Sequence, residues 1–466
     1  MLVVIVFLLQ LAHTCEYNLL VVDPAYLRLV LQLAHIYKCN FIRESPSKRS
    51  VRWRVSKERK YIVKVNRVEQ HLIKKSDGIY KIIDDLCFKS KNVYNYANYI
   101  VRQEFIKNNR WIRYNELASI MKDTEPYRDL GSNVGQQTLR LLDKNWKSYF
   151  KSIKDWSKNK DKYLGRPKLP KYKDKEKGRC ILIIDNIKCK IKDGYLRFSW
   201  KPLKPLNNKF KTNVTGKLMQ VRFIPRKNSY VMEIVYEIDV SETKEESHRI
   251  IGIDIGVDNL ATVANNVGLK PFIINGRPLK SINQYYNKKK AQIQSELKKK
   301  NNKDWSNRLQ KLTDKRNNKI NDYIHKASKH IIDWCVQNQI DTIVIGRNKN
   351  WKQESVMSKK VNQNFVEIPH GLFIEKIKYK AENKGIKVIE TEESYTSCTS
   401  FLDGEEPCEE NANKNRRICR GLFKSNKGVI INADLNGAYQ IIKKVFPNAF
   451  ADGIEGVGLH PVRVNL

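Results

Sequence analysis

The stretch RIIGIDIGVDNLAT, Arg249 to Thr262, decides how the last part of this chain folds. It contains an apolar run that leads to Asp254, which is flanked by Gly252 and Gly256, and this pattern predicts a strand buried on both faces. Ionised carboxylates are almost never buried unless they are paired or hold a metal ion. Asp254 is therefore a candidate functional residue, and the alternative is a solvated aspartate in the turn that ends the strand.

The charge of the chain predicts its class of partner. Its 466 residues carry a formal net charge of +39, with lysine and arginine spread along most of the sequence. Such a charge repels itself and binds phosphate backbones, so the composition predicts a nucleic-acid partner. A membrane surface is the weaker alternative, because the sequence offers no long basic helix with an apolar face. The length predicts roughly two to four domains.

The cysteines and the N-terminal residues predict where the protein works. The nine cysteines are irregularly spaced and form no CxxC pair, which favours a reducing cytosol over a disulfide framework. The apolar segment 1–15 is too short to span a bilayer and lacks the basic start of a signal peptide. The pentapeptide LQLAH occurs at 9–13 and again at 31–35. We interpret residues 1–57 as an atypical extension, from duplicated DNA or a start codon assigned too far upstream, with a targeting segment as the alternative.

Two interleaved zones follow the extension. Residues 58–70 and 165–240 contain short alternating runs that predict a small β-barrel or sandwich. Residues 71–164 have helical periodicity and are predicted to be a helical lobe inserted into that domain. The segment 152–179 mixes lysines with aromatic residues, as in grooves that track a nucleic-acid backbone and stack on bases, and a solvated linker is the alternative. The candidate contact residues are Trp156, Tyr163, Lys168, Lys171 and Lys173.

The third zone, 249–397 and 428–446, combines a strand meander with later strands that alternate with helices. This pattern predicts an RNase H-like α/β layer. The predicted strands after Asp254 are 260–263, 270–274, 341–346 and 385–397, and the predicted helices are a hairpin over 284–315, then 321–334 and 371–383, and a last helix capped by Asn432. The lysine triplet Lys288, Lys289 and Lys290 is a candidate for phosphate contacts.

Four segments of this zone resemble the TnpB family, the OrfB-type proteins of insertion sequences, which are similar to compact type V CRISPR effectors. The segments are IGIDIGVDNLAT, NDYIHKASKHII at 321–332, YTS at 395–397 and NADLNGAYQII at 432–442. The resemblance covers roughly residues 58–446 and implies an RNA-guided DNA endonuclease with a RuvC-type core, a wedge-like barrel and a recognition lobe. It implies a guide RNA from the transposon end and a double-stranded DNA target, in the cytoplasm and associated with the nucleoid, without a membrane partner.

The resemblance makes Asp254 the first acid and Asp434 the last acid of a two-metal Mg²⁺ site, where converging carboxylates support phosphodiester hydrolysis. The alternative for Asp434 is a first-turn aspartate that complements the helix dipole. Most relatives have a middle glutamate where this chain has Gly346. The next parallel strand opens toward the same crevice, so we predict that Glu393 is the replacement. Glu392 is the alternative, because neighbouring strand residues face opposite sides.

Residues 398–427 are predicted to be a degenerate zinc-ribbon-like insert. Many relatives carry two CxxC pairs there, whereas this interval holds only Cys398, Cys408 and Cys419, so we expect no structural zinc. The basic residues Arg416, Arg417 and Arg420 are candidates for phosphate contacts, with a solvated loop as the alternative. Residues 447–466 are predicted to be a C-terminal tail.

Three functions remain open at this point. In the favoured one, guide pairing supplies sequence specificity, the protein reads a short flanking DNA motif, and the three acids cut both strands. A nuclease-dead RNA-guided DNA-binding protein is the second, if both glutamates are solvated. The third is a DDE-type transposase, which joins DNA strands without a guide RNA.

Overall fold

The computed structural model describes residues 62–241, 248–347, 367–419, 421–451, 453 and 458–466. The chain divides into the units 1–59 and 60–466, and the fold described below belongs to the second unit. The predicted N-terminal extension, 1–57, lies outside the described residues. No helix within the described ranges is both long enough and apolar enough to cross a bilayer.

The first sheet is antiparallel and has the strand order β1-β6-β5-β2. Its strands are β1 (Ile62–Lys74), β2 (Leu182–Asp185), β5 (Lys217–Pro225) and β6 (Ser229–Ser241), and β3 (Cys189–Lys192) and β4 (Tyr195–Phe198) form a separate hairpin. Within the described residues β1 and β2 stay unpaired with each other, so the predicted barrel or sandwich is not confirmed. Closing a barrel requires more strands and a fixed stagger, and β2 is only 4 residues long.

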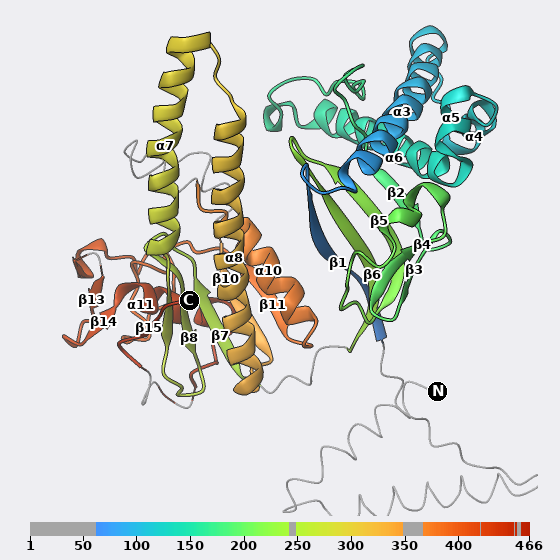
Figure 1. Ribbon diagram of the computed structural model, residues 1–466. Coiled ribbons are helices and arrows are strands. Elements are labelled where there is room, and N and C mark those ends of the chain that lie inside the picture. The colour runs from blue at the N-terminus through green and yellow to red at the C-terminus, as the bar shows by residue number, and fades with distance from the viewer. Residues whose placement is uncertain (1–61, 242–247, 348–366, 420, 452, 454–457) are drawn as a thin grey trace, which may run out of the picture. The chain divides into compact units, whose positions relative to one another are not determined.

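A cluster of helices lies between β1 and β2 in the sequence, as the helical periodicity predicted (Figure 1). Its members are α3 (Tyr80–Asn108), α4 (Tyr114–Met121), α5 (Glu125–Leu130), α6 (Ser132–Lys158) and the short turn η2 (Lys160–Lys162). Aromatic rings fill its interior: Trp146 is fully buried and meets Phe105 edge-on at 5.5 Å between centroids. Such packing fixes the helices relative to one another.

The second sheet has six strands in the order β11-β10-β7-β8-β9-β15. The strands are β7 (Ile250–Asp254), β8 (Asn259–Asn265), β9 (Phe272–Asn275), β10 (Thr342–Gly346), β11 (Lys387–Thr391) and β15 (Val462–Val464). As predicted, β7, β8 and β9 form an antiparallel meander, and β10 runs parallel to both β7 and β11. One face of the sheet packs on α8 (Asn307–Gln337) and α10 (His370–Glu382), and the other packs on α11 (Ala433–Val445).

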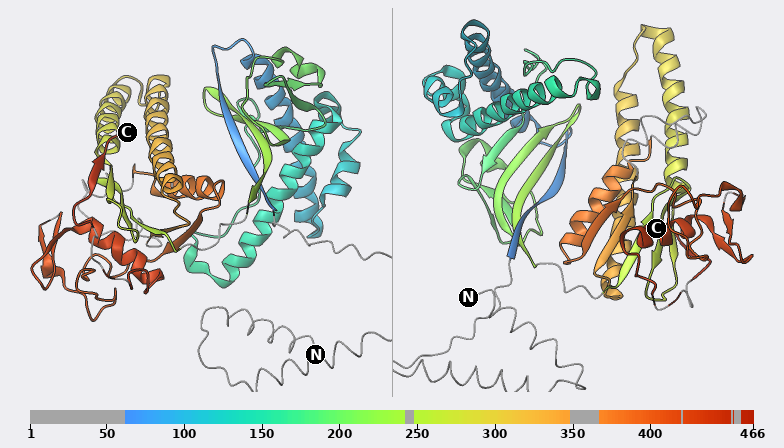
Figure 2. Two further views of the ribbon diagram at one scale, coloured as in Figure 1. Left: turned by 90° about the horizontal axis from the view of Figure 1, so that it is seen from below. Right: turned by 180° about the vertical axis from the view of Figure 1, so that it is seen from behind.

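The long helix α8 differs from its prediction. It is continuous over 31 residues and pairs with α7 (Arg277–Asn301), as the two further views show (Figure 2). We predicted a hairpin over residues 284–315 and a separate helix over 321–334. No glycine or proline occurs between residues 315 and 321, so nothing ends the helix, and packing from Ile320 onward continues it into the core.

Two more differences concern the C-terminal third. Strand β11 ends at Thr391, so the predicted strand through Ser397 is too long, and residues 394–398 form turns. The predicted tail contains β15, which pairs in parallel with β9 at the sheet edge. Three residues are too few to show a period in the sequence. The insert contains the turn η4 (Lys414–Arg416), β12 (Arg417–Cys419) and β13 (Leu422–Lys424). Strand β14 (Ile430–Asn432), just after the insert, joins β12 and β13 in one small sheet.

Candidate functional site

Asp254 is the last residue of β7, and two other carboxylates influence its pKa. Burial raises the pKa of Asp254 well above its usual value, and the charges of Glu393 and Asp434 raise it further. The guanidinium of Arg417 acts in the opposite direction. The structure therefore brings together the three acidic residues that the sequence singled out, which lie far apart along the chain.

Asp434 is positioned by the start of α11. The side chain of Asn432 caps the helix by accepting hydrogen bonds from the backbone N–H groups of Asp434, at 3.1 Å, and Leu435, at 3.0 Å. Asn259, the first residue of β8, donates its side-chain N–H to Asp434 Oδ2 at 2.7 Å. Sequence reasoning missed Asn259, although it lies in the DNLAT segment that identified the strand.

Two glycines allow α11 to pass close to the end of β7. A Cβ added at Gly437 would lie 3.2 Å from Asp254 Oδ2. A Cβ added at Gly252 would lie 2.3 Å from the carbonyl oxygen of Ala438, which no real side chain tolerates. The close approach of strand and helix is what brings the carboxylates of Asp254 and Asp434 near each other.

Glu393 reaches the site across the end of β10. A Cβ at Gly346 would lie 2.6 Å from Glu393 Cγ, so the glutamate side chain occupies the space next to that glycine. Burial raises the pKa of Glu393 to about 7. The neighbouring glutamates behave differently: Glu392 is exposed, and Glu390 forms ion pairs with Arg347, at 2.7 Å, and with Lys378.

The donors at this site are carboxylate oxygens, which suit a hard cation such as Mg²⁺. Asp254, Glu393 and Asp434 are the residues that would hold it. In the described ranges, however, no group of three or more His, Cys, Asp or Glu side chains is spaced to hold a metal ion by itself. Arg417 Nη2 lies 3.4 Å from Asp434 Oδ1, so a basic side chain of the insert shares this carboxylate.

The insert is fixed to α11 by buried amides. Asn436 accepts a hydrogen bond from the backbone N–H of Phe401 at 3.0 Å and donates to the carbonyl of Thr399 at 2.8 Å. Gln440 donates to Thr399 Oγ1 at 3.1 Å and to the carbonyl of Glu405 at 3.1 Å. Both amides are fully buried, so these hydrogen bonds connect the first turns of the insert firmly to α11.

The predicted basic residues of the insert have different environments. Arg416 is largely buried and pairs with Glu405 at 2.5 Å, whereas Arg417 reaches Asp434. Arg420 lies outside the described residues. Cys398 and Cys408 are partly exposed and Cys419 is exposed. The absence of a structural zinc stays a prediction.

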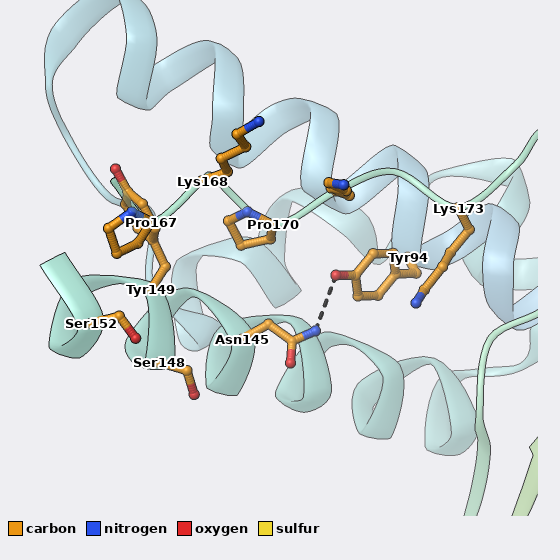
Figure 3. Close-up of a pocket in the computed structure, with 10 residues that line it drawn as sticks. Tyr94, Asn145, Ser148, Tyr149, Ser152, Pro167, Lys168, Pro170 and Lys173 are labelled. Atoms are coloured by element: carbon orange, nitrogen blue, oxygen red, sulfur yellow. Dashed lines mark hydrogen bonds between the residues drawn. The ribbon is translucent and has the colours of Figure 1, made fainter. Parts of the chain in front are cut away.

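The helical lobe contains a cavity of about 360 Å³ between α3, α6 and the segment that follows η2 (Figure 3). The polar and aromatic residues that line it, with two prolines, are Tyr94, Asn145, Ser148, Tyr149, Ser152, Pro167, Lys168, Pro170, Lys171 and Lys173. Asn145 donates a hydrogen bond to the hydroxyl of Tyr94 at 3.0 Å. Three predicted nucleic-acid contacts, Lys168, Lys171 and Lys173, therefore line one cavity, with hydroxyl and amide groups opposite them.

Side chains of α3 hold the lysine-bearing segment in place. Asn98 and Arg102 both donate to the carbonyl oxygen of Pro170, at 3.0 and 3.1 Å. Asn95 donates to the carbonyl of Lys173 at 2.9 Å and accepts from its backbone N–H at the same distance. The backbone that carries the lysines is thus anchored at several points, and their ammonium groups extend from a fixed base.

The other predicted contact residues lie elsewhere. Trp156 lies between Lys160 and Arg166, whose charges are 5.7 and 5.9 Å from its ring, and Tyr163 donates its hydroxyl to Asp155 at 2.7 Å. The lysine triplet is on α7. Lys288 is exposed there, Lys289 donates to Gln292 at 3.4 Å, and Lys290 lies 6.0 Å from the ring of Tyr286.

Comparison with known proteins finds similarity to transposase and Cas12f families. Residues 233–352 match the family model OrfB_IS605, described as a probable transposase, and residues 370–441 match the Cas12f1-like TNB domain. The chain is 23% identical over 394 residues to the TnpB-like protein ORF457 of Acidianus two-tailed virus, covering 76% of this chain and 81% of that protein.

A second relative and a solved structure extend the comparison. The CRISPR-associated endodeoxyribonuclease Cas12f2 of a Micrarchaeota archaeon is 26% identical over 239 residues, 48% of this chain and 41% of that protein. The chain thus matches about two fifths of Cas12f2. The structure of a Cas12f1–sgRNA–target DNA complex superposes with a TM-score of 0.52 at 15% identity, covering 78% of this chain and 82% of that one, which shows a shared multidomain α/β fold. By these matches the chain is similar to proteins of the TnpB/OrfB family and to the compact type V CRISPR effectors.

Proposed function

We propose that this protein is a transposon-encoded, RNA-guided DNA endonuclease with an RNase H-like, RuvC-type core. The observation that best supports this function is the meeting of Asp254, Glu393 and Asp434 at one edge of the second sheet, with Glu393 in the space beside Gly346. The antiparallel meander followed by parallel strands is the sheet order that an RNase H-like core requires.

The site residues would have distinct roles in hydrolysis. Bound Mg²⁺ would activate a water molecule and offset charge on the scissile phosphate. Asp254 and Glu393 are both partly buried, and their mutual repulsion favours a state in which a cation lies between them. Asn259 holds one oxygen of Asp434 by its hydrogen bond and so fixes the direction of that carboxylate. Since Mg²⁺ keeps several waters and binds phosphate oxygens, the nucleic acid would complete the ligand set.

The basic cavity of the helical lobe supports a nucleic-acid role for that part. Lys168, Lys171 and Lys173 provide charge for backbone phosphates, and Asn145 and Ser148 provide amide and hydroxyl groups for polar contacts. We propose that guide RNA pairing supplies sequence specificity and that the protein reads only a short flanking motif. The Cas12f1 relative was solved with sgRNA and target DNA, which supports RNA and DNA as the partners here.

The test is purification from the native host context, sequencing of co-purified RNA, and a plasmid-cleavage assay with Mg²⁺. Glu393→Ala is the site variant and Glu392→Ala is its matched control, because Glu392 is exposed next to it. We expect guided cutting by the wild type and the control and a loss of at least about 100-fold in Glu393→Ala. Robust cutting by Glu393→Ala would refute the proposed triad, and strand joining without bound RNA would indicate a DDE-type transposase.

One observation favours a second candidate, a nuclease-dead RNA-guided DNA-binding protein. Arg417 pairs with Asp434, and the described residues contain no closed group of metal ligands. The same experiment separates the two functions. A nuclease-dead protein would bind RNA and guided DNA but cut neither strand, and Glu393→Ala would leave its DNA affinity unchanged.

A further inference from the structure

A compact group of basic side chains lies between α8 and α10, apart from the carboxylates of the nuclease site. Lys376 Nζ lies 2.6 Å from His325 Nε2. Lys380, one turn later on α10, donates to the carbonyl oxygen of His325 at 2.7 Å and to Ser328 Oγ at 2.7 Å. Both ammonium groups therefore lie next to the same residue of α8.

Lys376 is buried and Lys380 is half-buried, and the charge of Asp333 acts on Lys380 from a distance. Lys376 is only 8% exposed, and among the described residues neither Lys376 nor Lys380 forms an ion pair. The acidic residues nearby on α8 are exposed and have their own partners: Asp322 pairs with Lys326 at 2.8 Å and Asp333 pairs with Lys329 at 3.9 Å. A buried ammonium group is costly unless an anion or a full set of acceptors compensates it.

The acceptors in place are too few for two ammonium groups. Each lysine ammonium has three N–H donors. In the described part of the chain Lys376 has one acceptor, His325, and Lys380 has two, both on α8. Burial lowers the pKa of Lys376 and lowers that of Lys380 to about 8, and the two lysines also help to lower the pKa of His325. A bound anion would compensate the two ammonium groups, because it supplies both a negative charge and acceptor oxygens.

We propose that His325, Lys376 and Lys380 form a binding site for a backbone phosphate of nucleic acid. A phosphate offers oxygens to several donors at once, and the ammonium groups of Lys376 and Lys380 both lie next to His325. The proposal rests on the nucleic-acid binding that the proposed function requires, but not on cleavage. It adds a contact on the helical side of the nuclease core, whereas the carboxylates lie at the edge of the sheet.

The test is a lysine-reactivity footprint on the intact protein. Acetylation rates at Lys376 and Lys380 are measured by mass spectrometry, with and without two probes: an RNA–DNA hybrid and a DNA duplex, each of about 20 base pairs. We expect at least one probe to slow acetylation at both lysines by about fivefold or more, and the probe that protects identifies the source of the phosphate. Equal rates with and without each probe, at concentrations that saturate binding, would overturn the proposal.

A salt titration supplies a second readout. The double variant Lys376→Gln/Lys380→Gln is expected to reduce the slope of log affinity against log salt by about 0.7–0.9 for the protected probe. The charge-matched control is Lys299→Gln/Lys384→Gln, at two exposed positions. An unchanged slope in a folded double variant would show that the lysines only connect two helices. Because neither readout involves DNA cutting, a failure here is distinct from a failure of the proposed nuclease activity.

Discussion

The carboxylate of Glu393 lies in the space that a side chain at position 346 would need. A Cβ on Gly346 would be 2.7 Å from Glu393 Oε1 and 2.6 Å from its Cγ. The two positions, on neighbouring parts of the sheet edge, can therefore hold only one acidic side chain between them.

The variant Gly346→Ala is expected to displace Glu393 and to reduce guided cleavage by about 100-fold, since a shift of about 1 Å in a reacting group has such an effect. Plasmid cleavage with Mg²⁺ measures it. The control is Gly371→Ala, because a Cβ at Gly371 meets nothing within 4 Å. Full activity of Gly346→Ala would show that Glu393 does not act from this place.

The exchange of the two positions is a separate prediction. The variant Gly346→Glu/Glu393→Ala returns a carboxylate to the end of β10 and removes one of the two side chains close to a Cβ there, the other being Ile441 with its Cδ1 at 2.5 Å. We expect this double variant to cut DNA at least about tenfold faster than Glu393→Ala alone, because it restores a third acid at the same edge. The same cleavage assay applies. Equal rates for the single and double variants would contradict the idea that the positions are interchangeable.

The metal-free protein is expected to lose stability as the pH rises from about 4.5 to about 7. Burial raises the pKa of Glu393 from 4.5 to about 7, so in this window the folded state binds more protons than the unfolded state. The free energy of unfolding, measured in urea with EDTA at several pH values, checks this. The free energy of unfolding of the wild type minus that of Glu393→Gln should decrease as the pH rises across this window. A difference that is constant with pH would contradict the raised pKa of Glu393.

Loss of the cap at Asn432 is expected to affect both stability and cutting. Asn432→Ala should lower the free energy of unfolding by about 1 kcal/mol and slow cleavage, because the cap also positions Asp434. The matched control is Ser306→Ala, which removes the cap of α8 by breaking a 3.2 Å bond from Leu309. Ser306→Ala should lower the free energy of unfolding, measured in urea, by a similar amount without slowing cleavage. Equal cleavage by both variants would show that Asp434 does not depend on its cap.

The ion pair of Arg417 with Asp434 is expected to compete with a divalent cation. Both side chains are partly exposed, at 41% and 33%, so the pair is weak, and Arg417→Gln should tighten Ca²⁺ binding by about two- to fivefold. Calorimetry without nucleic acid measures this affinity. Lys424→Gln, an exposed charge of the same insert, should change it less. Weaker Ca²⁺ binding in Arg417→Gln would mean that Arg417 supports the ion's site.

Strands and site residues could be predicted from the sequence where a pattern is long or a residue type is rare. The buried run before Asp254 predicted β7, and the meander after it followed from alternation in residues 259–275. The choice of Glu393 over Glu392 agrees with the partial burial of Glu393 and the exposure of Glu392. Our argument from strand alternation was wrong, since β11 ends at Thr391.

Contacts between distant segments could not be predicted. The bond from Asn259 to Asp434 joins residues 175 positions apart, and a single sequence has no signal for such a pair. In the sequence, the lysines of α10 have the pattern of an ordinary exposed basic helix. Only the packing of α10 against α8 shows that Lys376 is buried. The open first sheet was also out of reach, since strand periodicity does not tell whether the edge strands pair.

The pairing of α7 with α8 has a practical consequence. Helix α8 spans about 46 Å at about 1.5 Å per residue, and its second half, from Ile320, packs in the core while its first half is largely exposed. The connection between the helices, residues 302–306, is short and exposed for most of its length. We expect that two fragments separated at this connection would reassociate through α7 and α8. The connection is therefore a suitable site for a split protein whose fragments are active only after they associate.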